Sequence, residues 1–152
     1  MKEPLVSKML RISLYGVFIF GVLCTITLPF KLKSYIDYFK DSYQQIPGYR
    51  TFIFIFLFVI AIPALWSVLE MIGMLCSISQ GPFVMRNVHA LNRVGILLLV
   101  LAALFFAKCF VYVTFLTLVC GLLMLICGLF AFTLANLFRQ AVIFKEENDL
   151  TI

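Results

Sequence analysis

Apolar residues follow one another in long runs along this chain, and most of the charged residues lie in the short segments between those runs. The first run extends from about residue 12 to residue 30, and the second from about residue 52 to residue 77. A third stretch, residues 94–138, contains a single charged residue, Lys108. A helix crosses the hydrocarbon core of a bilayer with about 20 apolar residues, because lipid offers the backbone no hydrogen-bonding partner. The pattern therefore predicts membrane-spanning helices.

At a rise of about 1.5 Å per residue, the third stretch is about twice as long as one crossing requires, so it must fold back on itself. We expect the break at residues 107–113, where Lys108 can extend to the lipid headgroups, although no Gly or Pro marks a turn there. The sequence thus predicts an all-α fold, a four-helix transmembrane bundle that forms a single integral-membrane domain over residues 1–152. The expected helices cover residues 12–30, 52–77, 82–107 and 113–144, and a short cytoplasmic tail covers residues 145–152.

The segment between the first two helices, residues 31–47, has a pattern of its own. Apolar residues recur at helical spacing on one face, charged residues lie largely on the other, and the segment ends at Pro47-Gly48. This pattern predicts an amphipathic helix at the outer membrane surface, an interfacial spacer, with a lid or ligand-sensing element as the alternative. The apolar face consists of Leu32, Tyr35, Ile36, Phe39, Tyr43 and Ile46.

The composition excludes a soluble domain. Hydrophobic residues make up 64% of the chain and charged residues 12%, with a mean hydropathy of +1.11. Soluble domains are about half apolar. The basic N-terminus ahead of an apolar run resembles a secretory signal, but no A-x-A pattern follows, so we expect a retained first helix.

The distribution of Lys and Arg predicts the orientation in the membrane. Four crossings bring both termini to the same side, and seven of the 12 Lys and Arg residues lie on that side. Because positive residues favour the cytoplasmic side, we expect both termini in the cytoplasm. The net charge of +5 is spread over both surfaces, and no clustered basic patch indicates direct binding of nucleic acid.

Cysteine and histidine give no indication of a metal site or a cofactor. The five cysteines lack a short C-x-x-C spacing, and four of them lie in or beside apolar runs. The single histidine, His89, makes a metal site or a His-based catalytic triad implausible. No Gly-rich phosphate loop and no nucleophile with an evident base are present, so the sequence predicts no enzyme and no cofactor.

Small residues form a stripe on the last expected helix. Cys120, Cys127 and four Gly or Ala residues lie on or close to one helix face. Small side chains let two helix backbones approach closely in a membrane. We expect a helix-packing seam within the chain, with a homodimer seam as the alternative. The seam residues are Gly121, Gly128, Ala131 and Ala135.

Glu70 is the one acidic residue inside a spanning run. An unpaired carboxylate in the membrane is costly, so such a residue is a candidate functional site. If the second and third helices form a hairpin that folds near Gly81, residue 70 lies level with about residue 92. We predict a contact between Glu70 and Arg93. An ion pair that locks the hairpin is the favoured interpretation; a proton or cation site and a carboxylate facing the headgroups are the alternatives.

Two charged segments are expected on the cytoplasmic side. Pro82 after Gly81 marks the start of the third helix, whose first turns carry basic residues on one face. The tail after residue 144 is acidic and then apolar. The two segments have opposite charges, so they can attract each other or share a soluble partner, or the tail simply packs back on the third helix. The expected docking surface comprises Arg86, His89, Glu146, Glu147, Asp149, Leu150 and Ile152.

The ending EENDLTI, together with the motif GPF at residues 81–83, Asn87, Leu91 and Gly95, resembles the bacterial family catalogued as domain of unknown function 2975. This resemblance implies a small multi-pass protein of the bacterial cytoplasmic membrane without an assigned activity. It also implies that the protein is often encoded beside a small helix-turn-helix transcription regulator.

Three classes of function follow from these observations. The favoured one is an interaction or sensing protein that docks a cytoplasmic partner such as a helix-turn-helix regulator. The second is a small transporter that uses Glu70, and the third is an immunity protein against a membrane-active peptide. Membrane lipids are expected partners in every case.

Overall fold

The computed structural model of the chain describes residues 5–38, 48–78 and 84–149, and this part is almost entirely helical. Each of its four α-helices contains a segment that is long and apolar enough to cross a membrane, so the chain has the architecture of a multi-pass membrane protein. The predicted all-α, four-helix fold is therefore confirmed. The helices are α1 (Leu5–Tyr38), α3 (Tyr49–Ile78), α4 (Met85–Val111) and α5 (Phe115–Asp149).

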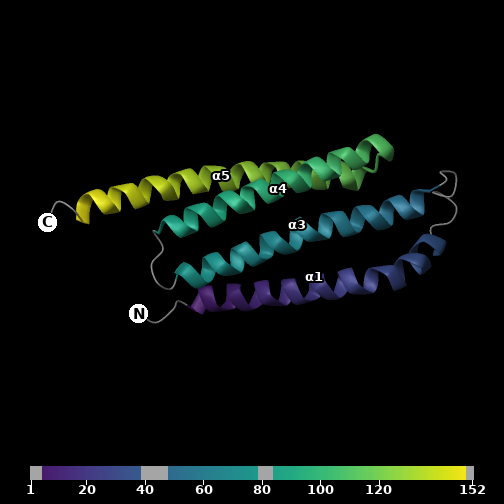
Figure 1. Cartoon of the computed structure of the whole chain (residues 1–152), viewed down its shortest axis with the longest axis horizontal. Coiled ribbons are helices and arrows are strands. Elements are labelled where there is room, and N and C mark those ends of the chain that lie inside the picture. The colour runs from purple at the N-terminus through teal and green to yellow at the C-terminus, as the bar shows by residue number, and fades with distance from the viewer. Residues whose placement is uncertain (1–4, 39–47, 79–83, 150–152) are drawn as a thin grey trace.

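The helices alternate in direction, and each packs mainly on its neighbour in the sequence (Figure 1). Helix α1 packs on α3, α3 on α4, and α4 on α5. One end of the bundle holds the start of α1, the end of α3, the start of α4 and the end of α5, and it is here called the terminal end (Figure 1). The opposite end holds the short connection between α4 and α5.

The connection between α4 and α5 consists of residues 112–114, within one residue of the expected break at 107–113. Tyr112 is extended, with φ −152° and ψ 113°, and its N–H donates to the Lys108 carbonyl at 2.9 Å. Tyr112, Val113 and Thr114 are aromatic or β-branched residues, which favour extended backbone over helix. Their side-chain preference ends α4 without a Gly or Pro.

Two helices are longer than the apolar pattern predicts. Helix α1 continues through Tyr38, so the first part of the expected amphipathic segment 31–47 extends this helix; residues 39–47 lie outside the described residues. Helix α5 continues to Asp149, so the assignment of residues 145–149 to a separate tail was wrong. Lys and Glu are good helix formers, and no Gly or Pro interrupts either extension. Helical hydrogen bonding therefore continues beyond the apolar runs.

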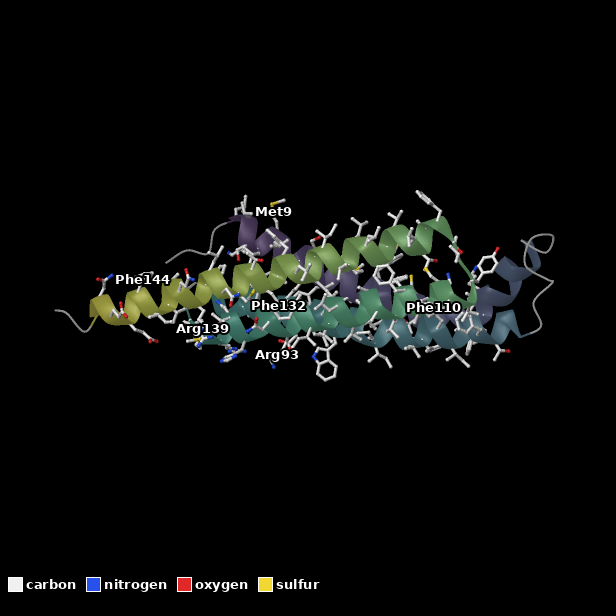
Figure 2. The ribbon with its side chains drawn as sticks, turned by 90° about the horizontal axis from the view of Figure 1, so that it is seen from above. Met9, Arg93, Phe110, Phe132, Arg139 and Phe144 are labelled. Atoms are coloured by element: carbon white, nitrogen blue, oxygen red, sulfur yellow. The ribbon has the colours of Figure 1, made fainter. Side chains whose placement is uncertain are left out.

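The tightest packing lies between α4 and α5, where the expected seam is located. A Cβ added at Gly128 would lie 3.0 Å from Leu99 and 3.3 Å from the Gly95 carbonyl oxygen of α4. Phe132 of α5 covers Gly95 of α4, and Figure 2 shows Phe132 between these two helices. Gly121 faces Phe105 and Phe106 in the same way. Ala131 and Ala135 of the seam are 6% and 1% exposed.

The seam is thus occupied within the chain. Near the terminal end it leads into a small core cluster formed by Val88, Ala135 and Val142, with Leu91 and Phe138 packed against it.

Exposure here means a surface that the protein itself does not cover, which in the spanning segments faces lipid. In helix α1 no residue between Leu5 and Lys31 is buried by this measure.

Candidate functional site

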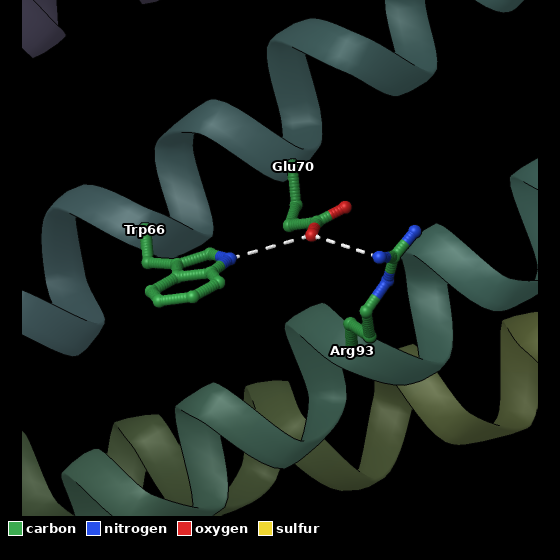
Figure 3. A network of polar contacts seen from close by, with 3 residues as sticks. All are labelled: Trp66, Glu70 and Arg93. Carbon is green, nitrogen blue, oxygen red and sulfur yellow. Dashed lines mark hydrogen bonds and ion pairs between the residues drawn. The ribbon is translucent and has the colours of Figure 1, made fainter.

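Glu70 lies on α3 about two turns before the helix ends, and its side chain is 15% exposed. The Arg93 side chain of α4 brings its Nη1 to 3.4 Å from Glu70 Oε1 (Figure 3). Trp66, one turn earlier on α3, directs its indole Nε1–H at the same oxygen, also at 3.4 Å. Both distances are longer than a strong hydrogen bond, so the ion pair is held by charge more than by directional bonding.

The local sequence explains this arrangement. Helix α3 ends at Ile78 and α4 starts at Met85, so an antiparallel hairpin puts residue 70 beside the first turns of α4. The structure thus brings Glu70 and Arg93 together in the register that the hairpin predicts. Trp66 was missed by the sequence reasoning, although its i, i+4 spacing to Glu70 places the two side chains on the same helix face.

The electrostatics of this site favour a link between helices. A carboxylate that the protein largely covers is stabilised by a nearby guanidinium. Arg93 is 59% exposed, so its outer N–H groups can also reach headgroups or water. A Trp side chain is also stable near the headgroups, because its ring is apolar and its N–H is polar. Glu70, Arg93 and Trp66 therefore tie α3 to α4 near the terminal end.

The residues of the expected docking surface lie at the terminal end. Arg86 and His89 are exposed in the first two turns of α4, and Glu146 and Glu147 are exposed near the end of α5. Packing of Val142 on Val88 fixes the two helices beside each other at this end. Asp149 is the last helical residue, and residues 150 and 152, the two apolar anchors of the prediction, lie outside the described residues.

The end of α5 projects beyond the other three helices (Figure 1). Val142 is 2% exposed and is the last buried residue of the helix, whereas Ile143 is 41% and Phe144 64% exposed. Figure 2 shows Phe144 close to this projecting end of α5, with Arg139 one turn earlier. Residues 143–148 thus form an exposed helical arm, here called the α5 arm, which carries two apolar side chains, one lysine, two glutamates and one asparagine.

A second polar group lies at the opposite end of the bundle. The Lys108 Nζ donates to Thr117 Oγ1 of α5 at 3.0 Å and lies 5.6 Å from the ring centroid of Phe56 of α3. Phe56 in turn makes an edge contact with Phe105, at 5.9 Å between centroids. The sequence reasoning placed Lys108 only at the headgroups. The hairpin register that pairs residue 70 with about residue 92 also pairs residue 56 with about residue 106. The same register therefore predicts that Phe56 lies near Lys108.

No bound group is required to explain either polar site. Among the residues that the structure describes, no three His, Cys, Asp or Glu side chains gather in a way that could hold a metal ion. The five cysteines, all in the described part of the chain, form no disulfide bond. The contacts at the two polar sites are an ion pair, hydrogen bonds and the contact of Lys108 with the Phe56 ring.

No curated protein and no solved structure matches the chain. A family model with the description "Protein of unknown function (DUF2975)" matches residues 9–152. This match includes all of α3, α4 and α5 and all but the first turn of α1, and with it both polar sites and the α5 arm. The chain therefore belongs to the DUF2975 family.

Proposed function

We propose that this protein is a non-enzymatic docking or sensing protein of the bacterial cytoplasmic membrane, which binds a cytoplasmic partner through the α5 arm and the exposed start of α4. The observation that carries the proposal is the projection of α5 beyond the other helices. A spanning helix needs about 20 residues, whereas α5 has 35. The side chains of residues 143–148, which follow Val142, are exposed, so this part of α5 extends beyond the buried residues of the bundle.

The chemistry of the α5 arm supports a protein partner. Ile143 and Phe144 supply apolar contact area, and Glu146 and Glu147 supply negative charge on the same helix. A helix of this kind binds by placing its apolar residues in a groove while its charges select a partner of opposite sign. A helix-turn-helix regulator is such a partner, because DNA-binding proteins carry basic surfaces.

The positive charges at the terminal end support the proposed orientation in the membrane. Arg86, Arg93 and Arg139 lie in the described helices towards the terminal end, and Lys and Arg residues favour the cytoplasmic side. This charge distribution supports an orientation with the α5 arm in the cytoplasm, where a transcription regulator is accessible. The Glu70–Arg93 pair then lies near the cytoplasmic headgroups and acts as a clamp between α3 and α4. The pairing favours this structural role over transport through Glu70.

The test is affinity purification from native membranes of three forms of the chain: wild type, a chain truncated after Phe144, and the double variant Glu146→Lys plus Glu147→Lys. The truncation point lies beyond Val142, so the whole packed part of α5 remains. We expect a helix-turn-helix regulator to copurify with the wild type and to be lost from both variants. The control Lys31→Glu, which changes an exposed charge at the opposite end, should retain it.

Recovery of the regulator with all four forms, or with none, would overturn the proposal. In the second case the transporter hypothesis is tested directly. Glu70→Gln would then abolish a proton- or cation-dependent flux in proteoliposomes, whereas Glu146→Lys plus Glu147→Lys would leave the flux unchanged.

A further inference from the structure

A groove between α3 and α4 opens at the end of the bundle opposite to the α5 arm. It has a volume of about 380 Å³. One wall comes from the first turns of α3 and the other from the last turns of α4. Apart from Lys108, every lining residue is aromatic or aliphatic, namely Phe52, Ile55, Phe56, Val59, Leu104, Ala107 and Val111.

Lys108 is held in place at this groove. Its hydrogen bond to Thr117, which is 5% exposed, and its position over the Phe56 ring fix the ammonium between α3, α4 and α5. An ammonium has three N–H donors, and Thr117 accepts only one of them. Among the residues that the structure describes, Lys108 has no carboxylate partner. The Lys108 ammonium therefore lies beside the apolar groove and has N–H donors that Thr117 does not use.

The position of Lys108 along α4 indicates which molecule fills the groove. Lys108 lies one turn before the end of α4, and the chain leaves the helix at Tyr112. Because this spanning segment ends at Val111, we expect the hydrocarbon of the bilayer to meet the headgroups at this level, where Lys and Tyr side chains are stable. An apolar groove open to the hydrocarbon is filled by acyl chains, so the ammonium at its rim decides which headgroup accompanies the chain.

We propose that this groove is a binding site for an anionic phospholipid. One acyl chain lies along Phe52, Ile55 and Val59, and the headgroup phosphate accepts hydrogen bonds from Lys108. A zwitterionic lipid also carries a phosphate, but its own ammonium group repels Lys108. The site therefore prefers a lipid with a net negative charge. One lysine near the surface favours such a lipid by about fivefold.

The experiment measures lipid retention by native mass spectrometry of the purified full chain, supplied with equal amounts of phosphatidylglycerol and phosphatidylcholine. We expect the wild type to retain phosphatidylglycerol about fivefold over phosphatidylcholine. Lys108→Met keeps the aliphatic stem but removes the charge, so the preference should disappear. Lys108→Arg should restore it, and Lys31→Met, which removes an exposed charge from α1 toward the same end, should leave it unchanged.

Two further arms separate the acyl chain from the headgroup. Ala107→Phe fills the groove from an exposed position and should lower the retention of both lipids. Glycerol phosphate, which has the headgroup charge but no chain, should not displace phosphatidylglycerol. The proposal is overturned if Lys108→Met keeps the preference, if Ala107→Phe keeps both lipids, or if glycerol phosphate competes as a free anion.

If Lys108→Met does not fold, two other variants still decide the question. Lys108→Arg keeps the positive charge, and Ala107→Phe keeps Lys108 and fills the groove. The lipid site and the partner-docking surface lie at opposite ends of the bundle. A chain truncated after Phe144 should therefore retain its lipid preference whether or not the regulator binds.

Discussion

The α4–α5 pair and the α1–α3 pair differ in packing far more than in hydropathy. The spanning segments of α3, α4 and α5 have mean hydropathies of 2.7, 2.7 and 2.6, and that of α1 is lower, at 2.0, but still high enough to cross a membrane. Yet glycines on α4 and α5 lie against aromatic side chains and backbone of the facing helix, whereas added Cβ atoms at Gly16 of α1 and Gly73 of α3 would meet nothing within 4 Å. One polar contact between α1 and α3 joins Arg11 Nη1 to Cys76 Sγ at 4.0 Å.

This difference teaches what holds helices together in lipid. Apolar surface gains nothing from packing on another helix instead of on lipid, because both environments are equally dry. Close backbone approach does bring a gain, through dispersion contacts, and it requires small residues in a continuous stripe. Helix α5 has such a stripe at Gly121, Gly128 and Ala135, and α1 has isolated glycines. Hydropathy therefore inserts all four helices, and residue size decides which of them pack tightly.

The largest expected effect comes from filling the seam. Gly128→Leu puts a side chain against the Gly95 carbonyl, which belongs to the α4 backbone and cannot turn away. We expect a loss of about 2 kcal/mol in the free energy of unfolding. The measurement is a titration with denaturing detergent, followed by circular dichroism. Gly73→Leu, with open space around it, is the matched control and should change stability by less than about 0.5 kcal/mol.

The next largest effect is expected at the Glu70–Arg93 ion pair, which links α3 to α4. We expect Glu70→Gln and Arg93→Gln to show a coupling of about 1 kcal/mol in a double-mutant cycle, because the pair is partly covered and close. The charge swap Glu70→Arg plus Arg93→Glu should recover part of the loss. A swap that is no more stable than the worse single variant would rule out the pairing. Arg86→Gln, on the same helix but outside the pair, serves as the control.

A smaller effect is expected at the one tight glycine of α1. A Cβ at Gly21 would lie 2.9 Å from Leu65 Cδ2, which is the end of a flexible side chain and can rotate away. We expect Gly21→Ala to cost less than about 0.5 kcal/mol. Gly128→Ala should cost about 1 kcal/mol, since its Cβ also meets backbone. Equal losses in the two variants, measured by the same titration, would mean that α1 packs as tightly as α5.

The smallest effect is expected from a truncation after Phe144, which removes the charged part of the α5 arm. A chain truncated after Phe144 loses the exposed side chains of residues 145–148 and keeps the buried Val142, so its free energy of unfolding should agree with the wild type to within about 0.5 kcal/mol. Truncation after Ala141, which also removes the buried Val142, is the contrasting variant and should be clearly less stable. If both truncations lower stability equally, residues 145–149 contribute to the packing of the bundle.

Some elements were predictable because they depend on local properties of the chain. The four helices follow from the apolar runs, and the seam follows from the spacing of Gly121, Gly128 and Ala135. The Glu70–Arg93 contact follows from the register of one hairpin. The ends of α1 and α5 were misjudged because the apolar pattern marks the depth of the membrane, whereas a helix continues into water wherever its residues are good helix formers.

Other features could not be read from the sequence. The Lys108 site combines Phe56 of α3 with Thr117 of α5, which are 61 residues apart in the numbering. The sequence predicts that Lys108 reaches a surface, but only the packing of three helices puts a buried hydroxyl and an aromatic ring beside it. The groove has the same origin, because it exists only where α3 and α4 leave space between their aromatic side chains.

The sequence by itself determined that this protein crosses a membrane four times, since backbone hydrogen bonds must be satisfied within each apolar run. It also determined where close helix contact is possible, since only small residues permit it. Tertiary structure alone decided which helix the seam contacts, how far α5 projects, and what surrounds Lys108. Those outcomes depend on the positions of side chains distant in sequence, and hydropathy, being nearly equal along three of the four helices, does not distinguish them.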